Sequence, residues 1–391
     1  MGFLALHAGR ALTPHAEIPD AIVLIEDGHI AAVGSRVEVR VPEGAKEIHA
    51  QDQTVVPGFV DLHIHGAGGH DVMEAGADAL DAVTSNAARF GTTTIVATTV
   101  SAPIEETCRS LEGIARYIRS PQNQHPSSVP RAEIVGIHLE GPFINPKRRG
   151  VHPAEAIIPP DASTLDRLLS AADGFARILT LAPELPGALD LIGRARAAGL
   201  VAAMGHTDAT YEQARAAIDC GASHAVHVFN AMRPFSHRET GVLGAVLTDS
   251  RVTAEIIADG IHVDEPAIRL LLSAKGTERV LLVSDGTAAT GMRDGTYELG
   301  PLEVIVQGGV CRSREGRLAG STLTLERAIR NVVSLGVPLL EVVRMATLYP
   351  ARRLGVTGRK GALVAGVDAD LVLLTPQLEV AGVMTRGRGL V

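Results

Sequence analysis

The stretch VVPGFVDLHIH (residues 55–65) decides the fold, because an apolar, strand-like run here ends in two histidines. Residues i and i+2 of a strand face the same side, so His63 and His65 are expected to point the same way. Seven more short β-like runs follow along the chain. They are TTTIVATTV (92–100), EIVGIHLEG (133–141), RILTLAPE (177–184), LVAAMGHT (200–207), HAVHVFN (224–230), TAEIIADG (253–260) and VLLVSDGT (280–287).

Helical stretches separate most of these runs, and strands that alternate with helices indicate a parallel sheet. The clearest helical stretches are residues 77–90, 163–175, 188–199, 210–221 and 265–276. Eight units over about 230 residues match an α/β fold, the (β/α)8 or TIM-like barrel, which places its chemistry at the C-terminal ends of the strands. We predict this barrel for residues 57–357, where a later helical region (322–355) closes the body.

The two ends of the chain have a different pattern, of short strands and turns. AIVLIEDGHIAAVG (21–34) alternates in polarity, and Asp27-Gly28 in its middle is a strong hairpin signal. GALVAGVDADLVLLTP (361–376) and LEVAGVMTRGRGLV (378–391) are similar. Neither end has a helical period long enough to stand alone. We therefore expect residues 1–56 and 358–391 to pair into a small β-sandwich domain.

Composition narrows the class of protein. The 391 residues include 36 Lys and Arg against 44 Asp and Glu, and the net charge of −8 argues against nucleic-acid binding through a bulk positive field. Three widely separated cysteines do not suggest a disulfide framework. The first residues do not resemble a signal peptide, and no apolar run approaches the roughly 18 residues of a membrane span. We expect a cytoplasmic enzyme that does not bind membranes.

Polar residues collect at the ends of five of the predicted strands. They are His63 and His65, Glu140 in HLEGP (138–142), His206 in GHT (205–207), His227 in HVFNAM (227–232) and Asp285 in SDG (284–286). Imidazole and carboxylate groups are ligands of zinc and similar first-row divalent ions. A single histidine at a strand end is more often a hydrogen-bonded structural residue. Five strands that end this way in one barrel indicate a metal site.

The number and positions of the lysines indicate which residue could bridge two metal ions. Many barrel hydrolases with two metal ions bridge them with a carbamylated lysine on a strand. The chain has only four lysines, Lys46, Lys147, Lys275 and Lys360. None of them lies at the C-terminal end of a predicted strand, so the bridging or anchoring carboxylate must be Glu140. Asp285 is then free to act as general base, near a metal that lowers the pKa of its bound water toward ~7.

Several motifs together carry a family resemblance. PGFVDLHIHGAGGHD (57–71), GIHLEGPFI (136–144), GHTDAT (205–210), HVFNAM (227–232), IIADGIHVD (256–264), SDGTAATG (284–291), LAGSTLT (318–324) and MATLYPARRLG (345–355) resemble the N-acetylglucosamine-6-phosphate deacetylases of the amidohydrolase superfamily. The resemblance runs from about residue 20 to the C-terminus. The pattern PG-x-x-D-x-H-x-H marks the superfamily only, whereas HLEGPF with HVFNAM and ADGIHVD is much narrower.

The resemblance implies metal ligands and a catalytic residue. Glu140, His206 and His227 match the family's main metal ligands, and Asp285 matches its catalytic acid and base. The two histidines of the first strand are present as well, so one or two metal ions can be accommodated in each subunit. Zinc is the expected ion, with iron, manganese or cobalt as alternatives.

The resemblance also implies a set of substrate-binding residues. They are Val151, His152, Asn230, Ala231, Arg238, Asp259, His262, Leu318, Ala319 and Gly320. His262 corresponds to a residue near the reacting carbonyl, and Asp259 is expected to orient His262 or its loop. Arg238 corresponds to an arginine that reaches the substrate phosphate across a dimer interface, which implies a homodimer. His70 and His138 are expected to be structural, and His224, three residues before His227, is expected on the opposite face of its strand.

The implied reaction is the hydrolysis of N-acetyl-D-glucosamine 6-phosphate to D-glucosamine 6-phosphate and acetate, in amino-sugar catabolism or recycling. Asp285 would deprotonate the metal-bound water and then protonate the departing amine. The galactosamine epimer or another N-acyl substrate is an alternative. A hydantoinase or dihydroorotase would favour a strand-four lysine, which is missing here. A non-catalytic scaffold of this superfamily would have lost metal ligands that are all present.

Overall fold

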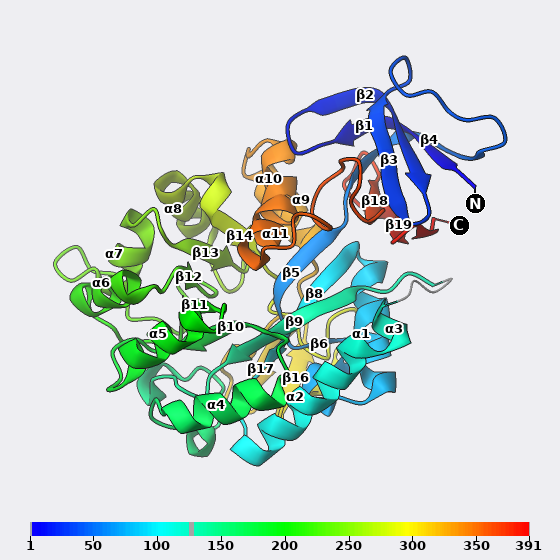
Figure 1. Cartoon of the computed structure of the whole chain (residues 1–391). Helices are drawn as coiled ribbons and strands as arrows, with labels where there is room; N and C mark the ends of the chain where they lie inside the picture. The colour runs from blue at the N-terminus through cyan, green and yellow to red at the C-terminus, as the bar shows by residue number, and fades with distance from the viewer. Residues whose placement is uncertain (1, 125–128, 391) are drawn as a thin grey trace.

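The eight β-like runs form one parallel barrel in the computed structural model, which describes residues 2–124 and 129–390. The strands are β5 (Phe59–Ile64), β8 (Thr92–Thr99), β9 (Glu133–Glu140), β10 (Ala176–Leu181), β11 (Val201–Met204), β12 (His224–Ala225), β13 (Thr253–Ile256) and β14 (Val280–Leu282). They lie side by side in chain order, and a parallel bridge between Ile64 and Gly286 connects the first strand to the segment after the last. The predicted (β/α)8 barrel is confirmed (Figure 1).

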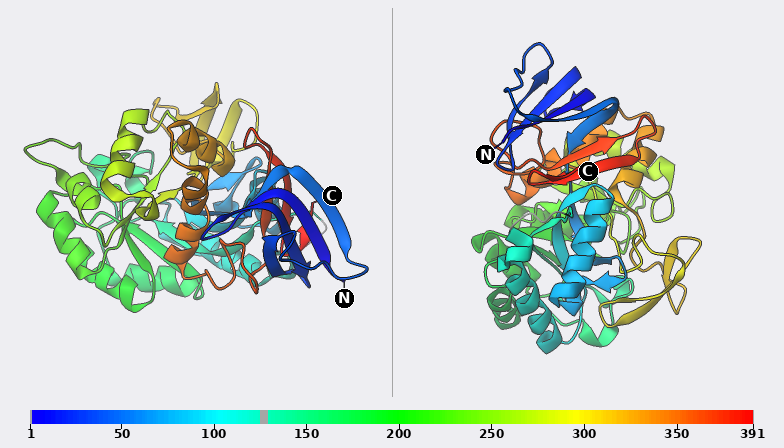
Figure 2. Two further views of the ribbon diagram at one scale, coloured as in Figure 1. Left: turned by 90° about the horizontal axis from the view of Figure 1, so that it is seen from above. Right: turned by 90° about the vertical axis from the view of Figure 1, so that its right-hand side faces the viewer.

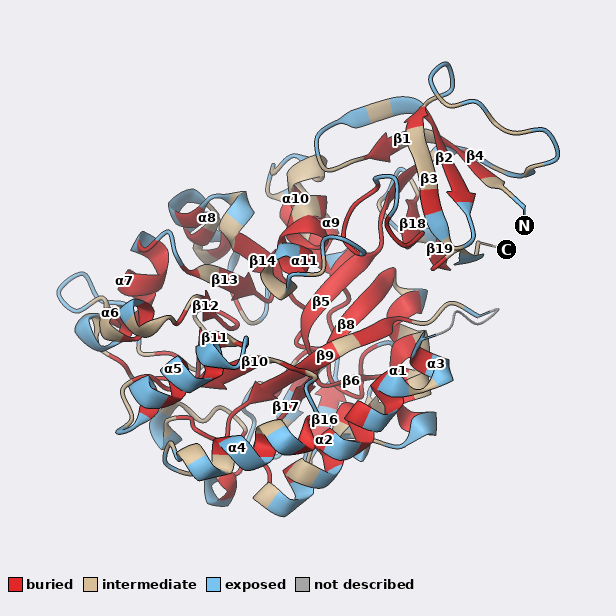
Figure 3. Ribbon diagram, in the orientation of Figure 1, coloured by how far each residue is buried: buried red, intermediate tan, exposed pale blue. Residues whose placement is uncertain are grey.

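Helices cover the outside of the barrel. They are α1 (Ala77–Arg89), α2 (Ile104–Arg119), α3 (Pro121–Gln124), α4 (Ala162–Ala171), α5 (Ala188–Ala197), α6 (Tyr211–Cys220), α7 (Gly241–Thr248), α8 (Glu265–Lys275), α9 (Leu325–Ser334), α10 (Leu339–Met345) and α11 (Leu348–Leu354). Their buried faces pack on the strands and their outer faces are exposed (Figure 3). α2 and α7 add to the helical stretches expected from the sequence. α7 shows no helical period because it is buried along almost its whole length.

The two chain ends come together in a small β domain. Its strands are β1 (Leu4–Leu12), β2 (Glu17–Glu26), β3 (His29–Ser35), β4 (Lys46–Pro57), β18 (Leu371–Leu374), β19 (Val380–Thr385) and β20 (Arg388–Gly389). They share one sheet, in which antiparallel pairing of β18 with β4 joins the two ends. Asp27 and Gly28 form the turn between β2 and β3, both with positive φ. Residues 1 and 391 of the predicted segments lie outside the described residues.

A buried lysine ties the small domain to the barrel. Lys360 is 1% exposed, and its Nζ lies 2.7 Å from Asp370, 2.7 Å from Glu133 at the start of β9, and 2.9 Å from Asp368. A buried ammonium group requires such partners, because its desolvation is costly when it is alone. This lysine therefore has a structural role at the N-terminal end of the barrel strands.

An additional three-stranded sheet follows β14, and the sequence patterns did not indicate it. It contains β15 (Gly295–Leu299), β16 (Leu302–Gln307) and β17 (Val310–Ser313), all antiparallel. Figures 1 and 2 show it well apart from the small domain. A short hairpin, β6 (Gly66–Ala67) and β7 (His70–Asp71), and four 3-10 turns, η1 (Val72–Glu74), η2 (Pro146–Arg148), η3 (Ala154–Ala156) and η4 (Thr277–Arg279), complete the elements. Among the described residues, none of the helices has the length and apolar character needed to cross a bilayer.

Candidate active site

Five imidazoles converge on the carboxylate of Glu140, which ends β9 and is 3% exposed. The Nε2 atoms that lie near a Glu140 oxygen belong to His227 (2.9 Å), His206 (3.2 Å), His63 (3.3 Å), His152 (3.3 Å) and His65 (3.4 Å). His63 lies in β5 and His65 directly follows it, His206 follows β11 and His227 follows β12. The structure thus brings all the predicted metal ligands together at the C-terminal ends of the strands.

Asp285 completes the cluster from the segment after β14. Its Oδ1 lies 3.2 Å from His65 Nε2 and 3.6 Å from His63 Nε2. Burial acts to raise the pKa of Asp285, but the hydrogen bond from His65 and the neighbouring imidazoles outweigh burial and hold the pKa below its ordinary value. Asp285 is therefore ionised at neutral pH and able to accept a proton.

The backbone is strained at three of these residues. His206, His227 and Asp285 have φ values of 48°, 28° and 49°, in the left-handed region that non-glycine residues rarely adopt. Such conformations cluster at functional sites, where the surrounding fold holds them in place. Each strand ends before its functional residue, and the side chain of each left-handed residue lies in the cluster around Glu140.

Hydrogen bonds at Nδ1 determine which histidines can bind a metal through Nε2. Nδ1 of His65 contacts the Thr98 carbonyl oxygen at 3.0 Å, Nδ1 of His206 contacts the Arg148 carbonyl oxygen at 2.9 Å, and Nδ1 of His63 contacts Glu255 at 2.9 Å. Each of these oxygens can only accept, so Nδ1 carries a proton, and in the neutral ring the Nε2 lone pair is then left for a metal. This is the tautomer of a metal ligand.

His152 has the opposite arrangement. The backbone N–H of Ser101 donates to His152 Nδ1 over 3.1 Å, so the ring proton must be on Nε2, which faces Glu140. Burial, followed by the neighbouring His206, lowers the pKa of His152 to about 4, and the ring is neutral. His152 is therefore a hydrogen-bond donor in the site. This assignment agrees with its predicted place among substrate-binding residues and separates it from the metal ligands.

The cluster has the chemistry of a divalent-metal site. Among the described residues, the buried His63 Nε2 has no hydrogen-bond partner, and neither has Nδ1 of His227. The Nε2 atoms of His206 and His227 lie 3.1 Å apart. Two donors 2.0–2.1 Å from a tetrahedral ion would be about 3.3 Å apart, close to this separation. Bare lone pairs facing each other around a carboxylate repel, and a shared cation would satisfy them.

Glu255 on β13 lies behind the cluster and was not predicted as a site residue. It is fully buried and contacts His63 Nδ1 at 2.9 Å, His224 Nε2 at 2.8 Å and the backbone N–H of His227 at 3.3 Å. The sequence offered one signal that could have identified Glu255, namely an acidic residue inside the otherwise apolar strand TAEII (253–257). His224 contacts Glu255, which also contacts His63, whereas His227 contacts Glu140.

The other residues expected to be structural are held by the fold. His138 is buried, with its Nε2 2.7 Å from the Thr180 hydroxyl, and His70 pairs with Glu74. None of the four lysines, all of which are described, reaches the cluster. Lys275 donates to the Asp249 carbonyl oxygen, and Lys147 lies in η2.

A cavity opens above the cluster, and most of the predicted substrate residues line it. The lining residues are His65, Val100, Glu140, Gly150, Val151, His152, His206, His227, Asn230, Ala231, His262, Asp285, Leu299, Leu318 and Gly320. Val100, Gly150 and Leu299 were not predicted. Leu299 belongs to the three-stranded sheet, whose position the local sequence patterns did not reveal.

Three predicted substrate residues do not line this cavity. Asp259 accepts a hydrogen bond from His262 Nδ1 at 2.7 Å, so it orients the histidine. Ala319 is fully buried beneath its loop. Arg238 is exposed in the loop after β12, outside the cavity of its own chain.

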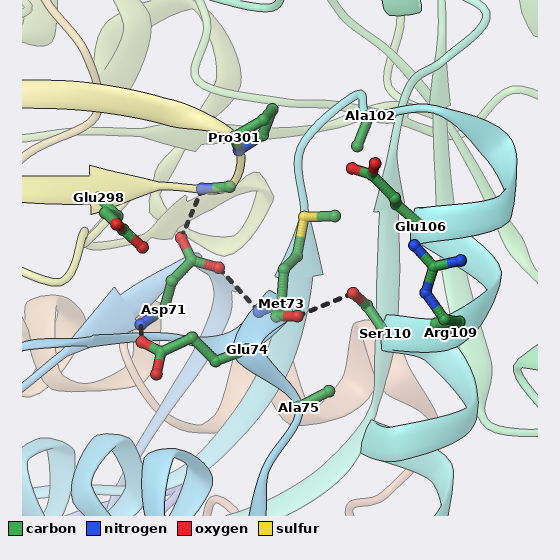
Figure 4. Close-up of a pocket in the computed structure, with 11 residues that line it drawn as sticks. Asp71, Met73, Glu74, Ala75, Ala102, Glu106, Arg109, Ser110, Glu298 and Pro301 are labelled. Carbon is green, nitrogen blue, oxygen red and sulfur yellow. Dashed lines mark hydrogen bonds between the residues drawn. The ribbon is translucent and has the colours of Figure 1, made fainter.

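The three-stranded sheet is anchored beside the cavity by Asp71. One carboxylate oxygen of Asp71 accepts the N–H of Gly300 at 2.9 Å, and the other accepts the N–H of Met73 at 2.7 Å. Figure 4 shows these bonds in a neighbouring pocket, which Glu106 and Arg109 of α2 also line. Gly300 directly follows Leu299, so this anchor fixes the wall of the cavity.

Comparisons with known proteins agree with this architecture. The model of the amidohydrolase family matches residues 54–390. The chain is 39% identical to N-acetylgalactosamine-6-phosphate deacetylase of Escherichia coli O157:H7, over 98% of both proteins. It is 36% identical to N-acetylglucosamine-6-phosphate deacetylase of Bacillus subtilis, over 96% of this chain and 94% of the relative. A mutant N-acetyl-D-glucosamine-6-phosphate deacetylase from Mycobacterium smegmatis, solved with N-acetyl-D-glucosamine-6-phosphate, is 40% identical with a TM-score of 0.92 over both full chains.

Proposed function

Because this chain belongs to the amidohydrolase family, we propose that it hydrolyses the acetamide of N-acetyl-D-glucosamine 6-phosphate to give D-glucosamine 6-phosphate and acetate. One observation carries the proposal. The cluster around Glu140 and the cavity above it are built from the motifs that resemble these deacetylases, and relatives with that printed activity match nearly the whole chain. Such an enzyme would act on a phosphorylated sugar in the cytoplasm, in amino-sugar catabolism or recycling.

The metal would be held by Glu140, His206 and His227, whose ligand atoms lie close together, and His63 and His65 would be the further ligands for a second ion. Zinc fits this nitrogen and carboxylate donor set, and iron, manganese or cobalt are the alternatives. When bound, the ion lowers the pKa of water toward ~7 and polarises the carbonyl group.

The chain's own residues move the protons. Asp285, ionised and beside the ligands, accepts the proton of the attacking water. It then returns this proton to the nitrogen of the departing amine, because an amide anion is too poor a leaving group to depart unprotonated. His152 lines the cavity with its Nε2–H turned to Glu140 and would contact the acetamide there, while Asp259 orients His262, which lines the same cavity.

The phosphate would be bound by Arg238 of a partner subunit in a homodimer. Arg238 is exposed and outside its own cavity, as a residue that serves a neighbouring site would be. A guanidinium group also suits a dianionic phosphate, which it can bind through two parallel hydrogen bonds.

The test is amine release from N-acetylglucosamine 6-phosphate after metal removal and replacement. We expect the chelated protein to lose activity, zinc to restore it, and free glucosamine 6-phosphate to appear with acetate in equal amounts. A metal-replete protein that releases no amine from this substrate would overturn the proposal.

The galactosamine epimer is a second candidate, because the relative from Escherichia coli O157:H7 carries that activity in its name. Assaying the two phosphorylated epimers side by side gives the ratio of their kcat/KM values. A ratio in favour of the galactosamine substrate would replace the glucosamine assignment without changing the class of reaction.

A further inference from the structure

Two histidines and a glutamate meet on the outer face of the small sheet, far from the barrel mouth. In the parallel pairing of β1 with β4, His7 lies directly opposite His49, and Glu47 precedes His49 by two residues on the same face. Figure 1 shows β1 and β4 together at the end of the molecule opposite the three-stranded sheet. No part of the proposed catalytic machinery uses these side chains.

The three ligand atoms are close enough to share one ion. Glu47 Oε2 lies 2.9 Å from His7 Nε2 and 3.7 Å from His49 Nε2, and all three atoms lie within 4.8 Å of one another. The two rings are stacked, with centroids 4.7 Å apart, so both imidazoles approach the carboxylate from one side. Small rotations of exposed side chains would bring all three donors to about 2.0–2.2 Å from a common centre.

His7 shows that this cluster differs from an ordinary ion pair. It is 6% exposed, yet among the described residues neither of its ring nitrogens has a partner with hydrogen-bond geometry, despite the 2.9 Å approach of Glu47. A buried polar group without a partner is costly and rare in folded proteins. The nitrogen faces a carboxylate at a distance suited to a shared cation.

The other two side chains leave the cluster open to solvent. The side chains of Glu47 and His49 are 45% and 56% exposed, so an ion could enter and keep water in its remaining positions. Gln51 lies 3.1 Å from His49 Nδ1 and can present either its amide nitrogen or its oxygen there, which permits the His49 tautomer with a free Nε2.

We propose that His7, Glu47 and His49 form a metal site separate from the active site. This site binds a first-row divalent ion such as Zn²⁺ and links β1 to β4. Two imidazoles and one carboxylate favour zinc and copper over magnesium, whose ligands are oxygen atoms. This link would stabilise the only parallel strand pair of the described small sheet.

The experiment counts zinc in the full-length protein. Wild type, His49→Ala and the control His15→Ala are stripped with chelator, dialysed against micromolar Zn²⁺ and analysed for metal per chain. His15 is a matched control because it is an exposed histidine of the same domain, in the turn between β1 and β2. We expect one zinc ion fewer in His49→Ala than in wild type or His15→Ala.

Further measurements separate this site from the active site. Glu47→Gln keeps the shape of the side chain but removes its charge. It should weaken the affinity of this site for zinc by at least about 10- to 100-fold, the scale for losing a group that supports a bound metal. Co²⁺ in place of zinc should give a visible absorption component that His49→Ala lacks. Deacetylation rates should be equal in all variants. Equal zinc content and equal Co²⁺ spectra in wild type and His49→Ala would overturn the proposal, whatever the activity.

Discussion

Hydrogen bonds at Nδ1 divide the histidines of the active site into two kinds. His63, His65 and His206 donate from Nδ1 to oxygen atoms and present a lone pair at Nε2, whereas His152 accepts at Nδ1 and presents a proton. Two imidazoles at similar distances from the same carboxylate therefore have different chemistry. The difference depends on whether the partner of Nδ1 is a donor or an acceptor, and it leads to predictions at single residues.

Asp285→Asn should retain the metal and the substrate but lose roughly 10²-fold or more in kcat, because an amide can neither accept the proton of water nor return it to the amine. Steady-state kinetics and metal analysis on the same preparation measure both properties. Glu140→Gln is the contrasting variant, since loss of the central carboxylate should remove most of the metal together with the activity. A near-normal kcat in Asp285→Asn would exclude its role as general base.

Glu255→Gln should weaken metal binding about 10- to 100-fold while the fold persists. Glu255 accepts hydrogen bonds from His63, His224 and the backbone of His227, and the amide of glutamine replaces one accepting oxygen with a donor. His63 would then turn or change tautomer and lose its free Nε2 lone pair. Competition with a chelator measures the affinity, and circular dichroism checks the fold. An unchanged affinity for the metal would show that Glu255 contributes only to packing.

At the scale of elements, the three-stranded sheet depends on one buried carboxylate. Asp71 accepts the N–H groups of Met73 and Gly300, and through Gly300 it holds β15 and Leu299 at the cavity. Burial raises the pKa of Asp71 from 3.8 to about 6, despite these two hydrogen bonds. The folded protein therefore binds this proton more readily than the unfolded chain does.

The sign of the pH dependence follows from that pKa. The stabilising contribution of protonated Asp71 is complete below about pH 3.8 and is lost as the pH rises through about 6. Since one pKa unit corresponds to about 1.4 kcal/mol, wild type should lose up to about 3 kcal/mol relative to Asp71→Asn between pH 4 and pH 7. Urea unfolding of both metal-free proteins measures this difference. A difference that does not change with pH would show that Asp71 titrates normally.

At the scale of the whole molecule, Arg238 does not line the cavity of its own chain, although Asn230 and Ala231, earlier in the same loop, do. In the proposed homodimer, Arg238 of one subunit reaches the cavity of the other. Arg238→Ala should then lower kcat/KM for the phosphorylated substrate roughly 10- to 150-fold, which corresponds to about 1.5–3 kcal/mol for a charge-assisted contact. Unphosphorylated N-acetylglucosamine is the control substrate, and its rate should barely change.

Mixed dimers test the geometry of this contact. Arg238→Ala and Asp285→Asn subunits, mixed and allowed to exchange, should form hybrids with one intact site and one doubly impaired site, so activity should partly recover. No recovery would argue that Arg238 acts within its own chain. Equal losses on both substrates in the single variant would assign Arg238 to structure.

The sequence alone determined the barrel, because eight apolar runs alternate with helical stretches and each pattern is local along the chain. It also determined the residues at the strand ends, since a barrel brings the C-terminal ends of its strands to one place. The chemistry of the site could be predicted for the same reason, because the imidazoles and two carboxylates at five strand ends meet around one centre.

Only the tertiary structure decided how these residues differ from one another. The tautomer of His152 depends on the N–H of Ser101, 51 residues away along the chain, and the orientation of His63 depends on Glu255, 192 residues away. Leu299 reaches the cavity because Asp71 anchors a sheet that has no strong local signal. Each of these facts rests on a contact between distant segments, and local patterns of polarity and spacing do not encode such contacts.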